Sequence, residues 1–255
     1  MPWFINLMLR KIFSKSTSNC TFSFIIFSSN SFFRSIYRYG TNIIELSISV
    51  LHNYAIIDVN GCDSMDKNIL IIGAARSGKT TLAKKFVKEK GYSMISLDNI
   101  ISGLSAYPEL QIHHDGDEFD TASRLVPFLE KFFTELSEGN AFYDGIKFVI
   151  EGTHIDFEKL IPFLRSDKFK DKYEIIGLTY NDISSDDLYN NMKKYDTEDD
   201  WTYWCSDEEL RGNSTYFVER NKFFNDKFKK YEITSYDTSF DREDVLEKIV
   251  SGINC

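Results

Sequence analysis

The sequence predicts an α/β fold, with a mainly parallel sheet of about five strands, helices on both faces of the sheet and a helical lid. Three observations predict it. Short apolar segments bounded by turn residues alternate with helical patterns. A glycine-bounded loop lies between the first such strand and the helix after it, and acidic residues directly follow two later strands. Ligands of open α/β sheets bind outside the carboxyl ends of the strands, so we expect the loop and the acidic residues to lie together at that edge of the sheet.

Composition and charge favour a globular protein of the reducing cytoplasm. The 255 residues are 42% hydrophobic, enough for a sizeable core. The net charge is −9 and no basic stripe is present, which argues against nucleic-acid or anionic-membrane binding. The four cysteines show no C-x-x-C pairing, so neither a zinc site nor a disulfide framework is indicated.

The first 64 residues differ from the rest. Residues 1–44 contain no Asp or Glu and five basic residues, and residues 65–255 carry a net charge of −11. This leader resembles an organelle transit peptide, and the apolar residues 22–27 are too few to span a bilayer. We hypothesise that the native protein starts at Met65, and that residues 1–64 are a poorly structured or non-native extension before a domain at 65–255. Alternatively, residues 43–59 add an edge strand or a hairpin.

The first predicted strand, residues 68–72, leads into a G-x-x-x-x-G-K-[ST] phosphate-binding pattern. Two glycines permit the backbone angles and close approaches that let N–H groups face phosphate oxygens. The lysine supplies a charge for the β- and γ-phosphates, and the threonine hydroxyl suits Mg²⁺. The expected phosphate-binding residues are Gly73, Ala74, Ala75, Arg76, Ser77, Gly78, Lys79, Thr80 and Thr81.

Acidic residues follow the next two predicted strands. Residues 92–97 deliver Asp98, which we expect to face the transferred phosphoryl group or its acceptor; the alternative is a cap of the following helix. Residues 147–150 deliver Glu151, expected to hold the hydration shell of Mg²⁺ together with Thr80. His154 is a candidate substrate contact, with a helix cap or a surface position as the more ordinary interpretation.

Between these two strands, an apolar face from Leu125 to Leu136 predicts a helix, with Pro127 in its first turn or at a kink. The acidic stretch before it, residues 109–120, contains His113 and His114 and is expected to be a solvated loop. Further strands are predicted at residues 173–178 and 231–236, and an amphipathic helix at 242–249.

The polar stretch 186–230 is the predicted lid. Its Arg211 and Arg220 are candidates for the cation that stabilises a transferring phosphoryl group. The alternative is that they form surface ion pairs with neighbouring acids of the same segment, Glu208, Glu209 or Glu219. Trp201 and Trp204 are expected to pack in the core.

Together these motifs resemble the P-loop small-molecule kinases, such as adenylate, shikimate and gluconate kinases. The resemblance covers residues 68–253 and implies the three-layer α/β/α sandwich of P-loop NTPases. It also implies that Lys79 and Thr80 bind ATP·Mg²⁺, that Asp98 lies beside the acceptor, and that Arg211 or Arg220 belongs to the lid. The turn at residues 237–239 would lie near adenine.

One departure bears on the acceptor. Nucleoside monophosphate kinases grip an acceptor phosphate with arginines after the second strand, whereas residues 99–146 here offer only Arg124 and Lys131. A neutral, hydroxylic or cationic small molecule is therefore expected, and a nucleotide ranks second. The chain would work as a monomer or homodimer. Alternatives are a regulatory ATPase or switch, although the Asn-Lys-x-Asp guanine pattern does not occur, and a kinase-type toxin that acts on a sugar nucleotide.

Overall fold

The computed structural model divides into two compact units, residues 1–64 and 65–255. It describes the backbone of strands at 21–28, 31–38, 48–51 and 54–57, and residues 67–114, 116–139, 145–181, 183–198 and 200–253. Of the described helices, none combines the length and the apolar character needed to cross a bilayer.

The first unit contains two antiparallel pairs of strands. Strand β1 (Thr21–Ser28) pairs with β2 (Ser31–Arg38), and β3 (Ile48–Leu51) pairs with β4 (Tyr54–Ile57). The second pair lies within residues 43–59, where the sequence allowed an edge strand or a hairpin. Both strands of this hairpin pair with each other, in a two-stranded sheet.

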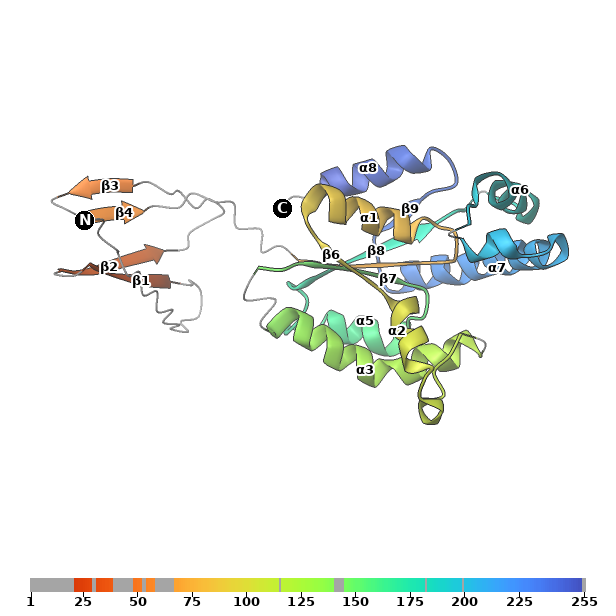
Figure 1. The fold of residues 1–255 in the computed structure, drawn as a ribbon, viewed down its shortest axis with the longest axis horizontal. Coiled ribbons are helices and arrows are strands. Elements are labelled where there is room, and N and C mark those ends of the chain that lie inside the picture. Colours follow the sequence, from red (N-terminus) through yellow and green to blue (C-terminus); the bar gives the residue numbers. More distant parts are fainter. Residues whose placement is uncertain are drawn as a thin grey trace. The chain divides into compact units, whose positions relative to one another are not determined.

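The second unit is built on a five-stranded parallel sheet of order β6-β7-β5-β8-β9 (Figure 1). Its strands are β5 (Asn68–Gly73), β6 (Ser93–Ser96), β7 (Phe148–Gly152), β8 (Tyr173–Thr179) and β9 (Ser235–Asp237). Five strands were expected, and all five form. The last is shorter than predicted, because Tyr231 closes the preceding helix α7 (Asp207–Lys230) and pairing starts only at Ser235.

Helices cover both faces of this sheet and make it a three-layer sandwich (Figure 1). One face carries α1 (Lys79–Lys90) and α8 (Arg242–Gly252), and the other carries α3 (Glu118–Glu138), α5 (Phe157–Leu164) and α7. Helix α2 (Leu97–Leu104) follows β6, and α6 (Ser185–Tyr195) packs on α7. The described residues also contain two short 3-10 turns, η1 (Pro108–Leu110) and η2 (Trp201–Trp204).

The central strand β5 explains why both layers are stable. All six of its residues are buried, and their side chains alternate between the two faces. Leu70 and Ile72 belong to the cluster under α3, α5 and α7, whereas Ile69 and Ile71 belong to the cluster under α1 and α8. Each such aliphatic side chain contributes roughly 1.5–3 kcal/mol on full burial. The strand therefore holds its carboxyl end, where the phosphate loop begins, in a rigid position.

Helix α3 corrects one expectation. Asp117 caps it by accepting hydrogen bonds from the backbone N–H groups of Phe119 and Asp120, so the helix begins at Glu118 and Pro127 lies in its interior rather than its first turn. A proline removes one helical hydrogen bond. The burial of the predicted apolar face, including Leu125, Leu129 and Phe133, outweighs that loss.

Candidate active site

The phosphate loop, residues 73–81, joins β5 to α1 at the carboxyl edge of the sheet. Glycine is required at two of its positions, for a different physical reason at each. A Cβ on Gly73 would lie 2.4 Å from the carbonyl oxygen of Leu178 on β8 and 2.7 Å from Ser77 Oγ. Gly78 stands at the N-cap of α1 with φ 94°, a left-handed conformation that favours glycine. The loop can therefore lie flat against β8 and turn sharply into the helix.

Lys79 lies across this loop. It is buried, and its Nζ donates a hydrogen bond of 2.8 Å to the carbonyl oxygen of Ala74. Burial lowers the pKa of Lys79, and the carboxylates of Glu151 and Asp98 oppose that effect. Ser77 Oγ is also buried and has no hydrogen-bond partner among the described residues. An ammonium and an unpartnered hydroxyl in one loop are donors suited to phosphate oxygens.

Glu151 stands next to the loop on β7, whose residues pair in register with β5 and β6. Glu151 is opposite Ile71 on one side and Ser96 on the other, and it is 3% exposed. Its charge acts on Lys79. In the described part of the chain no three His, Cys, Asp or Glu side chains group as a metal site. The exposed hydroxyl residue Thr80 and the Glu151 carboxylate are nevertheless donors that fit Mg²⁺, which keeps several waters and uses phosphate oxygens.

Asp98 lies in the first turn of α2, and its side chain is 55% exposed. Ser96 occupies the N-cap position, so the interpretation of Asp98 as the helix cap is wrong. The Nδ1 atom of His154 is 3.7 Å from Asp98 Oδ1. Interaction with His154 lowers the pKa of the Asp98 carboxyl, against the opposing effect of burial, and the charge of Lys79 lowers it further. Asp98 is therefore an ionised carboxylate at neutral pH.

A second histidine joins this group from a distant part of the chain. The Nε2 atom of His114 is 3.0 Å from Ser102 Oγ and 3.2 Å from the carbonyl oxygen of Asp98, and its ring centroid is 5.9 Å from that of His154. His114 is exposed as expected, but it is attached to α2 rather than simply solvated. His154 is not a cap, because Asp156 caps α5. The two histidines and Asp98 form a cluster that the sequence did not predict; Asp98 and His154 each closely follow a strand, but His114 lies in the loop before α3 and carries no such signal.

Arg220 is buried on the inner face of α7. Its Nη2 donates to Glu118 Oε1 at 2.8 Å, and the other oxygen of Glu118 accepts from the hydroxyl of Tyr216 at 2.9 Å. The guanidinium also lies 4.5 Å from the ring centroid of Phe119 and 4.3 Å from that of Phe223. The expected alternative, a surface pair with an acid of the same segment, is wrong for Arg220, because the arginine faces α3. The charge of Glu118 reaches Lys79, so this pair lies in the electrostatic field of the loop.

Arg211 occupies a different environment. It is exposed, pairs with Asp186 at 3.4 Å and lies 4.0 Å from the ring centroid of Tyr189, so it connects α7 to α6. This partner, too, differs from the predicted acids. Trp201 and Trp204 are 60% and 69% exposed, so their expected core position is wrong. They lie in the short η2 turn, where the ring of Trp201 is nearly perpendicular to that of Phe217, with centroids 6.2 Å apart.

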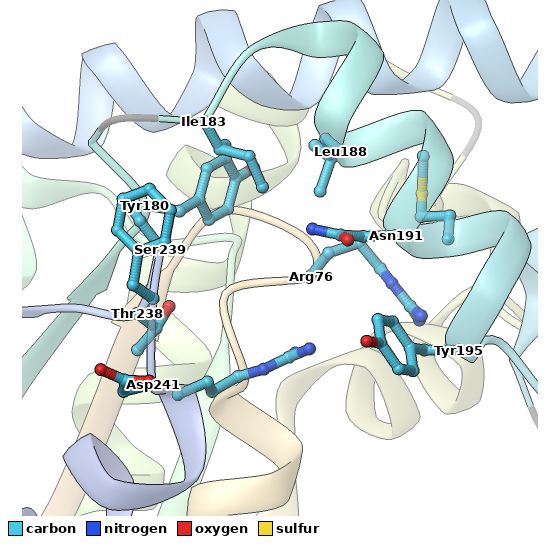
Figure 2. A pocket seen from close by; sticks show the side chains of 12 residues that line it. Arg76, Tyr180, Ile183, Leu188, Asn191, Tyr195, Thr238, Ser239 and Asp241 are labelled. Carbon is cyan, nitrogen blue, oxygen red and sulfur yellow. The ribbon is translucent and has the colours of Figure 1, made fainter.

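A cavity of about 320 Å³ adjoins the phosphate loop (Figure 2). Its wall comes from Arg76 of the loop, Tyr180 after β8, one face of α6, and residues 238–242, the last of which is the first residue of α8. Thr238 fixes the last of these to the loop, because its Oγ1 is 3.0 Å from the carbonyl oxygen of Ser77. Apolar side chains of Ile183, Leu188 and Met192 line the side formed by α6. The cavity thus opens beside the place where phosphates would bind.

No family model and no curated protein matches this chain. Among solved structures, a gluconokinase from Sinorhizobium meliloti 1021 is similar, with a TM-score of 0.44, 14% identity and coverage of 74% of this chain and 91% of that one. Shikimate kinase from Bacteroides thetaiotaomicron has a TM-score of 0.44, 16% identity and coverage of 73% and 95%. Deoxyadenosine kinase from M. mycoides with bound dATP has a TM-score of 0.36, 15% identity and coverage of 74% and 100%.

These three solved structures are small-molecule kinases, the class that the sequence motifs resemble. The parallel sheet of five strands with helices on both faces is the α/β sandwich predicted from the sequence, and the glycine-bounded phosphate loop follows its central strand.

Proposed function

We propose that the protein is a Mg²⁺-dependent kinase that transfers the γ-phosphoryl group of ATP to a small molecule. The observation that carries the proposal is the phosphate loop, in which Lys79 and the unpartnered hydroxyl of Ser77 stand beside the carboxylates of Glu151 and Asp98. A loop that only turned the chain would need neither a buried lysine nor an orphaned hydroxyl, since burying a charge or an unpaired hydroxyl is unfavourable.

The cavity beside the loop would receive the base and ribose. Its volume of about 320 Å³ lies at the lower end of the range for ligand pockets, roughly 300–1,000 Å³. The apolar wall from α6 suits a planar base, and Asn191 and the residues before α8 offer hydrogen-bonding groups around it (Figure 2). A nucleotide with its base in this cavity would place its phosphates on residues 73–81.

Mg²⁺ would be held by the Thr80 hydroxyl and, through water, by Glu151, and it would neutralise phosphate charge. Lys79 would exchange its bond to the Ala74 carbonyl for one to a phosphate oxygen. Asp98 would accept a hydrogen bond from the acceptor hydroxyl and hold it in line, and interaction with His154 lowers the pKa of this carboxylate. A carboxylate with a lowered pKa is a weak base, so positioning and charge stabilisation account for most of its effect.

The charges at this edge favour an acceptor without an anionic group. Asp98, Glu118 and Glu151 all act on Lys79, and the buried cation Arg220 is already paired with Glu118. A phosphate or carboxylate on the acceptor would be repelled by these groups. We therefore propose a neutral or cationic molecule with a hydroxyl group.

ADP release from the full chain with Mg²⁺ and ATP, with and without a panel of polyols, sugars, amino alcohols and nucleosides, tests the proposal. We expect release that depends on one acceptor class and disappears in Lys79→Ala. The matched control Lys84→Ala, which removes an exposed lysine of the same helix, should leave it unchanged. Acceptor-independent release would indicate an ATPase and contradict the kinase assignment.

A further inference from the structure

Arg76, in the middle of the phosphate loop, has an unusual backbone and an unusual partner. Its φ is 67°, a left-handed conformation in which non-glycine residues are uncommon. Its side chain runs away from the loop along α6, toward Tyr195 (Figure 2). There Nη1 lies 2.6 Å from Asp200 Oδ1, and Nη2 forms an ion pair with Asp196.

The two carboxylates belong to the connection between α6 and α7, more than a hundred residues along the chain. Asp196 caps the end of α6, its side chain is 3% exposed, and its second oxygen accepts from the hydroxyl of Thr202. Burial alone would raise the pKa of Asp200, but hydrogen bonds from Thr197 and from Arg76 hold it below the ordinary value. A carboxylate as buried as Asp196 requires a cation, and Arg76 supplies it.

The neighbouring loop residue is attached to the same part of the molecule. The hydroxyl of Tyr180 is 3.0 Å from the carbonyl oxygen of Ala75 and 2.9 Å from that of Phe217 on α7. Two consecutive residues of the phosphate loop therefore contact the α6–α7 part, one through a tyrosine and one through an ion pair. Arg76 also forms a wall of the cavity.

We infer that Arg76 is a positioning residue that couples nucleotide binding to the α6–α7 connection; this rests on the proposed function. The ion pairs with Asp196 and Asp200 hold the loop turn and the wall of the cavity in one arrangement. The nucleotide would bind that arrangement. Its affinity would therefore depend on these ion pairs, although they do not contact the nucleotide phosphates. Coupling of this kind between two sites usually amounts to a 5- to 150-fold change in affinity, as an order of magnitude.

Two variants separate the effect of the Arg76 side chain from that of its backbone conformation. Arg76→Gly removes the guanidinium but accepts a positive φ without strain, so the turn itself is preserved. Asp200→Asn removes one partner at a half-exposed position and leaves the loop sequence untouched. Two substitutions outside the site are matched controls. Arg165→Gln removes a guanidinium that donates to the carbonyl oxygen of Glu232, and Asp167→Asn removes an exposed carboxylate that pairs with Lys170.

Equilibrium titration of the full chain with ADP and Mg²⁺ gives the affinity without any phosphoryl transfer. We expect the dissociation constant to rise about 5- to 150-fold in Arg76→Gly and to rise in Asp200→Asn, with both controls unchanged. In the double variant the effect of Asp200→Asn should disappear, because its partner is gone. In turnover, KM for ATP should rise with little change in kcat.

Tryptophan fluorescence reports the connection directly. With Trp3→Phe as background, the remaining tryptophans are Trp201 and Trp204, both in the η2 turn. ADP should change their quenching by acrylamide in this background and fail to do so in Arg76→Gly. Wild-type affinity in both variants, with an unchanged ADP response, would overturn the inference alone. Absence of any nucleotide binding by the wild-type chain would overturn the proposed function and, with it, this inference.

Discussion

Replacement of Lys79 by methionine removes the ammonium and keeps most of the apolar stem, so it separates charge from packing. In the structure Nζ makes one hydrogen bond, to the carbonyl of Ala74 at 2.8 Å, and the residue is 8% exposed. Loss of a hydrogen bond to a charged group costs roughly 1.5–3 kcal/mol. Burial also lowers the pKa of Lys79, so the folded protein disfavours its charged form, and methionine relieves that desolvation.

These two effects oppose each other, and we expect a net destabilisation of no more than about 2 kcal/mol. For a domain of this size that corresponds to a decrease in Tm of less than about 8 °C. Activity should respond very differently. A preorganised donor aimed at developing charge is worth about 10²–10³ in kcat, and a buried cation at the transferring phosphoryl group should be worth at least that much.

The assay pairs thermal unfolding by circular dichroism with ADP release at saturating ATP and acceptor. Lys84→Met is the matched control, because it changes an exposed lysine five residues further along α1. Full turnover in Lys79→Met, with the fold intact, would refute the assignment of this lysine to catalysis. A decrease in Tm well beyond about 8 °C would refute the energetic offset between the lost hydrogen bond and the relieved burial.

Three further predictions follow from single residues. Asp98→Asn should reduce kcat by roughly 10²-fold while KM for ATP changes little, because the amide no longer holds the acceptor hydroxyl in line; an equal loss of turnover and of ATP affinity would assign Asp98 a structural role. Gly73→Ala, whose Cβ would meet the backbone of β8 at 2.4 Å, should destabilise the protein by about 1–3 kcal/mol, whereas Gly103→Ala in open space should not. Hydrogen bonds from Lys227 and its neighbours lower the pKa of Glu158 to about 2 in the folded protein, below its unfolded value. Its contribution is therefore present above about pH 4.5 and lost toward pH 2, and the difference in Tm between wild type and Glu158→Gln should vanish over that range.

The sequence predicted the sheet well because its central strands are buried on both faces. Such strands are near-continuous apolar runs, and β5 and β7 each end at a glycine that marks the edge of the sheet. The prediction was wrong where two patterns overlapped. Residues 231–234 read as the start of a strand, but α7 continues to Lys230 and Tyr231 closes it, so only three residues of β9 remain to pair.

The site was predictable only where it is local in sequence. The phosphate loop is a continuous pattern, and Asp98 and Glu151 each directly follow an apolar run, so both could be found from the strands alone. The cluster of Asp98 with two histidines could not be predicted, because it forms only when the loop before α3 packs against α2. The ion pairs of Arg76 likewise join residues about 120 positions apart.

The charges around Lys79 connect these observations. The carboxylates of Glu151, Asp98 and Glu118 act on the buried ammonium of Lys79, and the charge of Arg76 opposes them. A triphosphate would add several negative charges, which Lys79 alone could not balance at short range. A divalent cation between Thr80, Glu151 and the phosphates would remove most of that repulsion, and it gives a physical reason for an acidic residue beside a phosphate loop. By the same balance, an acceptor that brought its own negative charge would restore the repulsion at Asp98, and this repulsion is the physical reason for proposing the hydroxyl of a neutral or cationic molecule rather than a second phosphate.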